Sequence, residues 1–536
     1  MSFLALSCVV LPFAIGVTQA EGASEDPARG PAGPQRPNIV VVMVDDLGWR
    51  DTSPAVWTGP AGDSAAHFQT PFLERLAREG TRFSEGYASA PVCTPSRTSF
   101  MTGMSPARSG ITYWTKEVDR DTSAGHPLLA APKWRVNALQ PGDVTLAGIL
   151  SSAGYRTIHL GKAHFGTGVG GDPTKLGFDV NVAGWAGGGP GSYYGIDDFS
   201  ADGRARRAGR KGGNRSWDVP DLSAYHGKEI FLTDALAIEA ERELRAAAAA
   251  ERPFFLHFAP YAVHAPLMVN PRVADRFPGL EGPELAYATL VASADDALGR
   301  LLGTIDEVGL ADNTIVLYMG DNGGLSAHGR GGPKHTHNLP LRSGKGSAYE
   351  GGIRVPMIVR WPGVSKAGAV VAGPVVTHDW FTTLAEAAQA PVPAPHATRV
   401  EGLDLLPAIA GREPVPERPI VFHQPHYWGV AGPGIEPFSA LRFGDHKLIY
   451  FHSGANVDPE TGKRSGGPRF ELYRVQDDLG ETRDLASSKP LRLAAMAEML
   501  SVELEAARAG MSIVKATGEP VDLPRASLRP LAAKNR

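Results

Sequence analysis

The sequence predicts an α/β protein in two parts: a large domain around a mostly parallel central sheet with helices on both faces, and a smaller C-terminal subdomain with an antiparallel sheet and a terminal helix. Apolar runs rich in β-branched residues alternate with helical patterns along most of the chain, which is typical of parallel sheets. A Pro-rich stretch at 390–418 interrupts this order, and short strand patterns follow it. We therefore expect domains over 37–400 and 401–536.

The elements of the large domain alternate in the order that a parallel sheet requires. Residues 38–44 form a continuous apolar run, the pattern of a strand buried on both faces. Thr70-Pro71 begins a helix that Gly80 ends. Residues 184–226, rich in Gly, Arg and Asp, are predicted to form a long surface insertion. Three further helix–strand pairs are predicted at 144–153 with 156–160, 227–250 with 254–258, and 285–308 with 314–319.

Shorter patterns predict the C-terminal subdomain. A helical pattern over 491–509 ends before Gly510, a residue that commonly terminates helices. The strands of the small antiparallel sheet are predicted at 420–422, 439–442, 447–451 and 471–474.

Length and composition restrict the class of protein. A chain of 536 residues suits one large domain and a smaller one. Hydrophobic residues at 43% and charged residues at 21% are ordinary for a globular protein. With a net charge of -4, the chain has no broad basic field for phosphate contacts, so we expect no nucleic-acid partner. The oligomeric state is left open.

The N-terminus has the features of an export signal. Residues 3–17 are nearly all apolar, carry no charge and are short for a membrane span. Thr18-Gln19-Ala20 places small residues where a signal peptidase cleaves, although no Lys or Arg precedes the apolar stretch. We predict a signal peptide over 1–20, a flexible leader over 21–36, no stable membrane insertion, and a periplasmic or extracellular location. The alternative is a buried N-terminal strand or helix.

Polar side chains follow four of the predicted strands directly. In open parallel sheets, ligands bind beyond the carboxyl ends of the strands, so these side chains are expected at one edge. Each of them taken singly also suits an ordinary turn or loop. The residues at the four strand ends are Asp45 and Asp46, Lys162 and His164, His264, and Asp321 and Asn322.

Three carboxylates and an amide form an all-oxygen set at this edge. Asp45, Asp46, Asp321 and Asn322 offer the ligands that Ca²⁺ or Mg²⁺ prefers, whereas Zn²⁺ favours His or Cys. We predict a hard divalent cation here, Ca²⁺ more than Mg²⁺.

Cys93 is a candidate reactive residue. The other cysteine, Cys8, lies in the predicted signal peptide, so no disulfide within the mature chain is possible. Pro95 and Gly103 indicate a short helix that begins near Cys93, where backbone N–H groups favour an anion. Arg97, four residues on, returns to the same face of that helix. The alternative is a buried, inert thiol with a solvated arginine.

These motifs together resemble those of the sulfatase family. Cys93-Thr94-Pro95-Ser96-Arg97 is similar to the family signature, and the other motifs occur in the family's order across most of the large domain. The resemblance is strongest to the branch of arylsulfatase A and N-acetylgalactosamine-6-sulfatase, in a bacterial secreted form, and implies an alkaline-phosphatase-like fold. The remaining motifs are Asp45-Asp46-Leu47-Gly48, Gly161-Lys162-Ala163-His164, His264-Ala265-Pro266, Gly320-Asp321-Asn322-Gly323 and the run 341–352.

The resemblance implies a mechanism for sulfate ester hydrolysis. A formylglycine-generating enzyme or anaerobic maturase would convert Cys93 to formylglycine (3-oxoalanine), whose hydrated form attacks sulfur. Ca²⁺ would be held by Asp45, Asp46, Asp321, Asn322 and the modified Cys93. The other implied roles are Arg97 as support for the modified residue, Lys162 and Lys345 as sulfate ligands, His264 as proton donor to the leaving oxygen, and His164 as base.

The substrate is predicted only as a class. We expect a sulfated carbohydrate cleaved at a chain end, or an aryl sulfate, with His226, His426 and Arg442 as candidate substrate contacts. His426-Tyr427-Trp428 offers an aromatic platform for a sugar ring, although packing between the domains explains it equally well. The competing functions are a phosphomonoester or phosphonate hydrolase on the same fold, a non-catalytic binder of sulfated glycans, and a cytosolic enzyme with an unmodified cysteine.

Overall fold

A computed structural model describes residues 36–53, 68–115, 125–250, 252–453 and 469–528, with 456–457 and 464–465 between the last two ranges. The predicted signal peptide and the predicted leader up to residue 35 lie outside these residues. Within the described ranges, every helix is too short or too polar to cross a membrane.

The central sheet has eight strands in the order β5-β4-β6-β1-β7-β8-β2-β9. All neighbouring strands are parallel except at β8, which is antiparallel to both β7 and β2. The predicted mostly parallel sheet is therefore confirmed, although β2, β5, β8 and β9 were not predicted. The strands are β1 Asn38–Val44, β2 Thr81–Tyr87, β4 Arg156–Gly161, β5 Val180–Val182, β6 Phe254–Ala259, β7 Thr314–Gly320, β8 Met357–Arg360 and β9 Ala369–Val376.

The strand β1 lies at the centre because its sequence is apolar on both faces. All seven of its residues are buried, and it pairs in parallel with β6 on one side and β7 on the other. The alternate side chains Val40 and Val42 enter one hydrophobic core, whereas Ile39 and Val41 enter a second core across the sheet.

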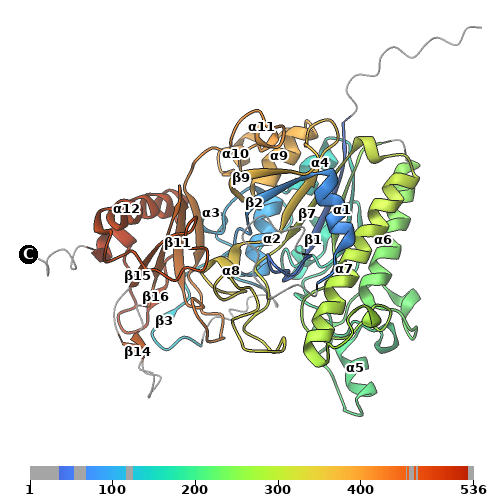
Figure 1. Ribbon diagram of the computed structural model, residues 1–536, viewed down its shortest axis with the longest axis horizontal. Helices are drawn as coiled ribbons and strands as arrows, with labels where there is room; N and C mark the ends of the chain where they lie inside the picture. Colours follow the sequence, from blue (N-terminus) through green and yellow to red (C-terminus); the bar gives the residue numbers. More distant parts are fainter. Residues whose placement is uncertain are drawn as a thin grey trace, which may run out of the picture. The chain divides into compact units, whose positions relative to one another are not determined.

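Helices cover both faces of the sheet (Figure 1). On one face α1, α6 and α7 pack in the first core, and on the other α2, α4 and α9 pack in the second. The helix α6 begins at Leu232, five residues later than predicted. The helices are α1 Pro71–Glu79, α2 Cys93–Thr102, α3 Pro106–Ser109, α4 Leu146–Ser152, α5 Ala201–Arg207, α6 Leu232–Ala248, α7 Gly282–Glu307, α8 Glu350–Ile353, α9 Asp379–Ala387, α10 Ala394–Ala397 and α11 Leu406–Ile409.

The C-terminal part contains the predicted antiparallel sheet, in the order β10-β11-β12-β15. The predicted terminal helix is α12, Pro490–Ala507, which packs over this sheet (Figure 1). The boundary at residue 400 remains a prediction. The strands are β10 Ile420–Gln424, β11 Phe438–Phe443, β12 His446–Phe451 and β15 Arg469–Arg474, with the short pairs β13 Asn456–Val457 with β14 Arg464–Ser465, and β3 Leu129–Ala130 with β16 Ile513–Val514.

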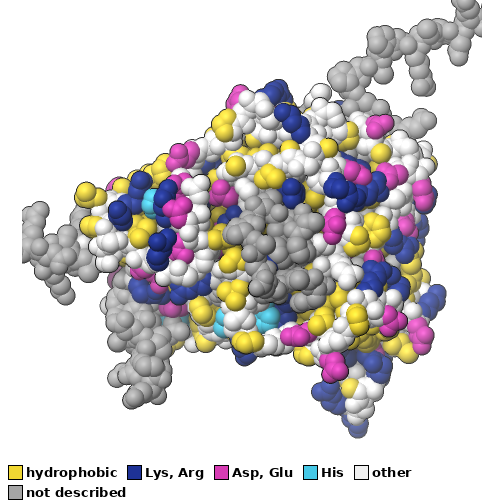
Figure 2. Space-filling model, viewed as in Figure 1, with side chains coloured by type: hydrophobic (Ala, Val, Ile, Leu, Met, Phe, Trp, Pro, Cys, Tyr) yellow, Lys and Arg dark blue, Asp and Glu magenta, His cyan; other side chains and the backbone are white. Residues whose placement is uncertain are grey.

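On the face shown in Figure 2, basic and acidic side chains are interspersed.

Candidate active site

The carboxyl ends of four neighbouring strands meet at one edge of the sheet. The strands β4, β6, β1 and β7 lie side by side and run in the same direction, so the segments that leave them converge. The residues that the structure brings together from these ends are Asp45, Asp46, Lys162, His164, His264, Asp321 and Asn322.

Cys93 is the first residue of α2 and faces these strand ends. Its Sγ lies 3.6 Å from Asp45 Oδ1 and 4.0 Å from Asp46 Oδ1. The helix ends at Gly103, whose φ of 70° lets the chain turn away in a left-handed conformation. Burial raises the pKa of Cys93 to about 12, so the unmodified thiol is protonated at neutral pH.

Three buried carboxylates each pair with one buried cation. We name these six residues the strand-end cluster, which has no net charge when all six are ionised. The pairs are Lys162 Nζ with both oxygens of Asp45 at 2.7 Å, Lys345 Nζ with Asp46 Oδ1 at 2.6 Å, and Arg97 Nε with Asp321 Oδ2 at 2.7 Å.

The two adjacent aspartates of the cluster differ in acidity. Burial raises the pKa of Asp45 to about 8, with Lys162 opposing the increase. Burial alone would raise the pKa of Asp46 too, but Lys345, His264 and Lys162 together hold it below its ordinary value. Asp46 therefore stays ionised. A cation bound beside Asp45 would lower the raised pKa of that carboxyl and so favour its ionised form.

The site has the donors for one metal ion. Ligand atoms of Asp45, Asp46, Cys93 and Asp321 lie within 4.8 Å of one another. Asn322 Nδ2 donates to Asp46 Oδ1 at 2.9 Å, whereas its buried Oδ1 has no partner among the described residues. An unpaired buried amide oxygen is costly, and a cation would satisfy it. This mainly oxygen set fits Ca²⁺ or Mg²⁺ better than Zn²⁺.

Two histidines approach the strand-end cluster. His264 Nε2 lies 3.8 Å from Asp46 Oδ2, and its Nδ1 lies 2.7 Å from the carbonyl oxygen of Ala265. His164 adopts a left-handed backbone with φ 52°, and its Nε2 lies 2.5 Å from the carbonyl oxygen of Thr115. Burial lowers the pKa of His264 to about 3 and that of His164 well below its ordinary value. Both are neutral at pH 7 in the free protein.

The segment 184–226 is a surface insertion only in part. Residues 208–215 are exposed as predicted, whereas its glycine-rich first part, 187–193, is buried. A Cβ atom at Gly188 would lie 2.7 Å from His164 Cε1, and one at Gly189 would lie 2.6 Å from His264 Nδ1. The backbone can cover both imidazoles only because these positions have no side chain. The prediction missed the buried part because loop polarity says nothing about what a glycine run packs against.

A cavity of about 180 Å³ opens at the cluster. Its floor is formed by cluster residues and the two histidines. Three tryptophans, which come from three separate loops, form part of its wall. The lining residues are Asp46, Val92, Cys93, Trp114, His164, Gly188, Trp217, His264, Ala265, Leu325, His328, Lys345 and Trp428.

The predicted substrate contacts lie elsewhere. His226 is exposed and is not among the residues that line the cavity. His426 is buried, with Nε2 2.8 Å from Thr112 Oγ1, and Arg442 is buried and pairs with Glu85 at 2.7 Å. The structure therefore places none of these three side chains at the cavity: His226 is exposed, and tertiary packing gives His426 and Arg442 other partners. Of the predicted aromatic platform, Trp428 reaches the cavity.

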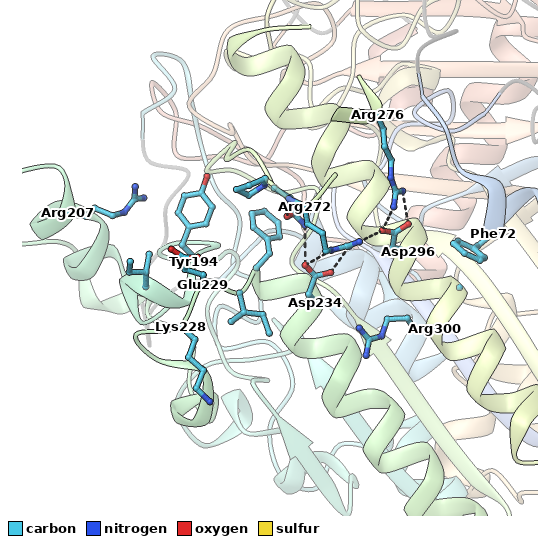
Figure 3. A pocket seen from close by; sticks show the side chains of 16 residues that line it. Phe72, Tyr194, Arg207, Lys228, Glu229, Asp234, Arg272, Arg276, Asp296 and Arg300 are labelled. Atoms are coloured by element: carbon cyan, nitrogen blue, oxygen red, sulfur yellow. Dashed lines mark hydrogen bonds and ion pairs between the residues drawn. The ribbon is translucent and has the colours of Figure 1, made fainter. Parts of the chain in front are cut away.

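A larger cavity of about 1110 Å³ lies between the segment 184–226 and the helices α6 and α7 (Figure 3). Arg272 lies between Asp234 and Asp296 and contacts both carboxylates at 2.8 Å. The other arginines of this cavity each pair with a carboxylate as well. Those pairs are Arg207 with Asp197, Arg276 with Asp296, and Arg300 with Glu241.

A cavity at the strand ends of an α/β sheet, bordered by carboxylates that could hold a metal ion and by a buried lysine, suits an enzyme that hydrolyses anionic esters. Comparison with known families makes the class specific, since the model of the Sulfatase family matches residues 37–390. The chain belongs to the sulfatase family and is a hydrolase of sulfuric esters.

Curated relatives agree with this assignment over much of the chain. N-acetylgalactosamine-6-sulfatase of Canis lupus familiaris is 33% identical over 74% of this chain and 70% of its own length. Human arylsulfatase A is 29% identical over 90% of both chains. The predicted resemblance to this branch is confirmed.

Solved structures share the fold. A structure described as Ps i-CgsB has a TM-score of 0.69 at 26% identity, covering 88% of this chain and 93% of its own. A complex of Ps i-CgsB with k-i-k-neocarrahexaose has a TM-score of 0.68 at 24% identity, covering 94% and 98%. The phosphonate monoester hydrolase of Agrobacterium radiobacter has a TM-score of 0.57 at 17% identity, covering 90% and 97%, and shares the fold alone.

Proposed function

We propose that this sulfatase uses formylglycine at position 93 and a Ca²⁺ ion to release sulfate from the terminal ring of a sulfated carbohydrate. The observation that carries the proposal is the position of Cys93: the N-terminus of α2, 3.6 Å from Asp45 Oδ1 and inside the metal-ligand set. A cysteine at this point is surrounded by the groups that a sulfate ester needs.

Modification of Cys93 would provide a nucleophile that the unmodified thiol does not provide. The unmodified thiol is buried and protonated, and it is a poor nucleophile in that state. A hydrated formylglycine has two hydroxyls, one to attack sulfur and one whose deprotonation allows sulfate to leave. Because Cys93 is 3% exposed, the modifying enzyme must reach it before folding is complete.

Asp45, Asp46, Asp321 and Asn322 would hold the cation, which would polarise sulfate oxygens when bound. The charge of the strand-end cluster supports this. A divalent cation would compete with Lys162 and Lys345 for their carboxylates, which would leave both ammonium groups available to bind oxygens of the anionic sulfate ester.

The histidines and the arginine have separate roles. Arg97 is anchored by Asp321 and by the carbonyl oxygen of Lys162, 2.8 Å from its Nη1, and supports residue 93 from below. His264 lines the cavity and would give a proton to the leaving oxygen, after the bound anion raises its low pKa. His164, whose buried Nδ1 has no partner among the described residues, would accept the proton of the second hydroxyl.

The substrate class is supported by relatives and by the size of the site. One relative is named for N-acetylgalactosamine 6-sulfate, and a structural neighbour is a complex with the carrageenan oligosaccharide k-i-k-neocarrahexaose. The cavity of about 180 Å³ is smaller than the roughly 300–1,000 Å³ of pockets that enclose drug-sized ligands. A sulfated ring at a chain end fits it better than two neighbouring rings. We also propose export, from the N-terminal pattern.

The test is sulfate release from a panel of sulfated mono- and disaccharides. The chain is co-expressed with a formylglycine-generating enzyme, and the mass of the peptide that contains residue 93 is determined. We expect sulfate release with Ca²⁺ and a peptide mass that matches formylglycine. Release of phosphate from phosphate or phosphonate esters, with Zn²⁺ in place of Ca²⁺, would instead support the rival function. A lack of turnover despite confirmed formylglycine would point to longer glycans or to an ester that is not a sugar sulfate.

A further inference from the structure

Three of the nine tryptophans in the chain line the small cavity at the strand-end cluster. Trp114 follows α3, Trp217 lies in the 3₁₀ turn Arg215–Trp217 of the glycine-rich segment, and Trp428 lies between β10 and β11. All three side chains are half-buried. Half-buried indoles that converge on one cavity from distant parts of the chain present apolar faces to a ligand, because they are not needed to fill a core there.

Trp428 is held directly beside the sulfate-binding lysine. Its ring lies against Gly346, where a Cβ atom would approach Trp428 Cε3 to 2.3 Å, and Lys345 Nζ lies 6.0 Å from the ring centroid. His328 supports the ring edge-on, with the two ring centroids 5.5 Å apart at 62°. The C-terminal sheet therefore supplies one wall of a cavity whose floor belongs to the large domain.

Trp114 is the third side chain of this wall. Its indole Nε1 is buried and has no hydrogen-bond acceptor among the described residues, so the side chain meets the cavity with its apolar ring.

We infer that Trp114, Trp217 and Trp428 form a subsite for the ring that carries the sulfate. The substrate class is a sulfate ester of a single ring with an apolar face, a terminal pyranose. The inference rests on the proposed function for the position of the sulfate, which the lysines and the cation hold. The tryptophans contact only the ring to which the sulfate is attached.

The experiment measures binding to Ca²⁺-loaded Cys93→Ser protein, so that it does not depend on turnover. The probes are inorganic sulfate, which has no ring, and the 6-sulfates of galactose, glucosamine and N-acetylgalactosamine. We expect at least one sugar sulfate to bind more tightly than inorganic sulfate. Trp217→Leu, Trp428→Leu and Trp114→Phe should each weaken that sugar sulfate by about three- to tenfold and leave the Kd of inorganic sulfate within about twofold.

The matched control is Trp134→Phe. Trp134 is also half-buried and packs edge-on against His426, with ring centroids 4.9 Å apart, but does not line the cavity. It should leave both affinities unchanged. Equal weakening of sulfate and sugar sulfate in the three variants would overturn the inference, as would sugar sulfates that bind no better than sulfate. Trp428→Phe replaces Trp428→Leu if the latter does not fold.

The restriction to a terminal ring is tested with oligosaccharides that carry one sulfate. We expect a disaccharide sulfated on its terminal ring to bind like the monosaccharide, and a trisaccharide sulfated on its middle ring to bind at least about tenfold more weakly. Equal affinities would overturn the single-ring subsite. Sulfate release by the unsubstituted enzyme tests the proposed function separately. If the tryptophan variants bind sugar sulfates as well as the Trp134→Phe control does, the subsite is refuted and the proposed function is not.

Discussion

Two buried ion clusters of this protein look alike in composition and differ in what surrounds them. The strand-end cluster has three carboxylates and three cations. A second one, which we call the Lys447 cluster, has two of each, and Lys447 Nζ lies 3.1 Å from Glu350 Oε1 and 2.9 Å from Glu481 Oε1. Both are balanced in charge when every member is ionised. The members of the Lys447 cluster are Glu350, Arg354, Lys447 and Glu481.

The difference lies in the neighbouring space. The strand-end cluster borders the cavity through Asp46 and Lys345. In the Lys447 cluster, Tyr87 and a backbone N–H also bond the carboxylates, and no member lines that cavity. Both clusters contain buried side-chain atoms without a hydrogen-bond partner among the described residues. Buried, perturbed charges and unpaired atoms alone therefore do not identify an active site; the adjoining cavity does.

The largest expected effect is that of Cys93→Ser. A serine has one hydroxyl, so it cannot replace the two hydroxyls of a hydrated formylglycine. Sulfate release should fall at least about a thousandfold, with the melting temperature changed by no more than ~2 °C. Ser99→Ala on the same helix should keep full activity. Substantial turnover by Cys93→Ser would contradict the proposed nucleophile.

Lys162→Met should lower activity without unfolding the protein, which would distinguish the strand-end cluster from the Lys447 cluster. With Ca²⁺ present, the cation compensates Asp45, so the protein should remain folded. Loss of a positive charge at the sulfate should lower kcat/KM by about 100- to 1,000-fold. The measurements are steady-state kinetics and thermal unfolding in Ca²⁺. A variant that unfolds but retains its kcat/KM would assign Lys162 a structural role.

Lys447→Met should have the opposite phenotype. It leaves Glu350 and Glu481 buried without their shared cation, which should lower the free energy of unfolding by about 3–5 kcal/mol. The kcat/KM of the folded fraction should change by less than about threefold, because no sulfate contact is lost. Urea unfolding and kinetics on the same sample check both values. A large loss of kcat/KM with unchanged stability would refute the distinction between the clusters.

The Lys447 cluster should also respond to pH. Burial raises the pKa of Glu481 from 4.5 to about 7, against the effect of Lys447. Between these values the folded protein keeps a proton that the unfolded chain has lost. The contribution of Glu481 is therefore fully present below pH 4.5 and is lost as the pH rises through about 7.

Glu481→Gln removes this titration. Urea unfolding at pH 5 and pH 8 should show a loss of up to about 3 kcal/mol in the unsubstituted protein and a smaller loss in the variant. The control is Glu498→Gln on α12, whose carboxylate side chain is 57% exposed. If Glu481→Gln keeps the full pH dependence, another group is responsible.

The smallest effect is expected at His226. Its side chain is exposed and is not among the residues that line the cavity. His226→Ala should therefore change kcat/KM for sugar sulfates by less than about twofold. A larger decrease would restore His226 as a substrate contact and enlarge the site beyond the three tryptophans.

The chemistry-bearing residues could be predicted from the sequence because parallel strands have a common direction. Once 38–44 and 314–319 are recognised as buried strands, Asp45 and Asp321 must lie at the same edge of the sheet. The same local patterns predicted α1 and α12. They missed β2 and β8: β2 has Arg, Ser and Glu among its seven residues, and β8 has only four residues.

The sequence by itself determined the fold class, the family and the polar residues of the strand ends, since these depend on local periodicity and on short motifs. Only the tertiary structure decided that Trp114, Trp217 and Trp428 share one cavity, that Gly188 and Gly189 cover the histidines, and that His426 does not reach the site. The physical reason is the sequence separation of the contacts that position each residue. A strand positions the residue that follows it, whereas the direction of a loop side chain is set by contacts with segments far away in the chain.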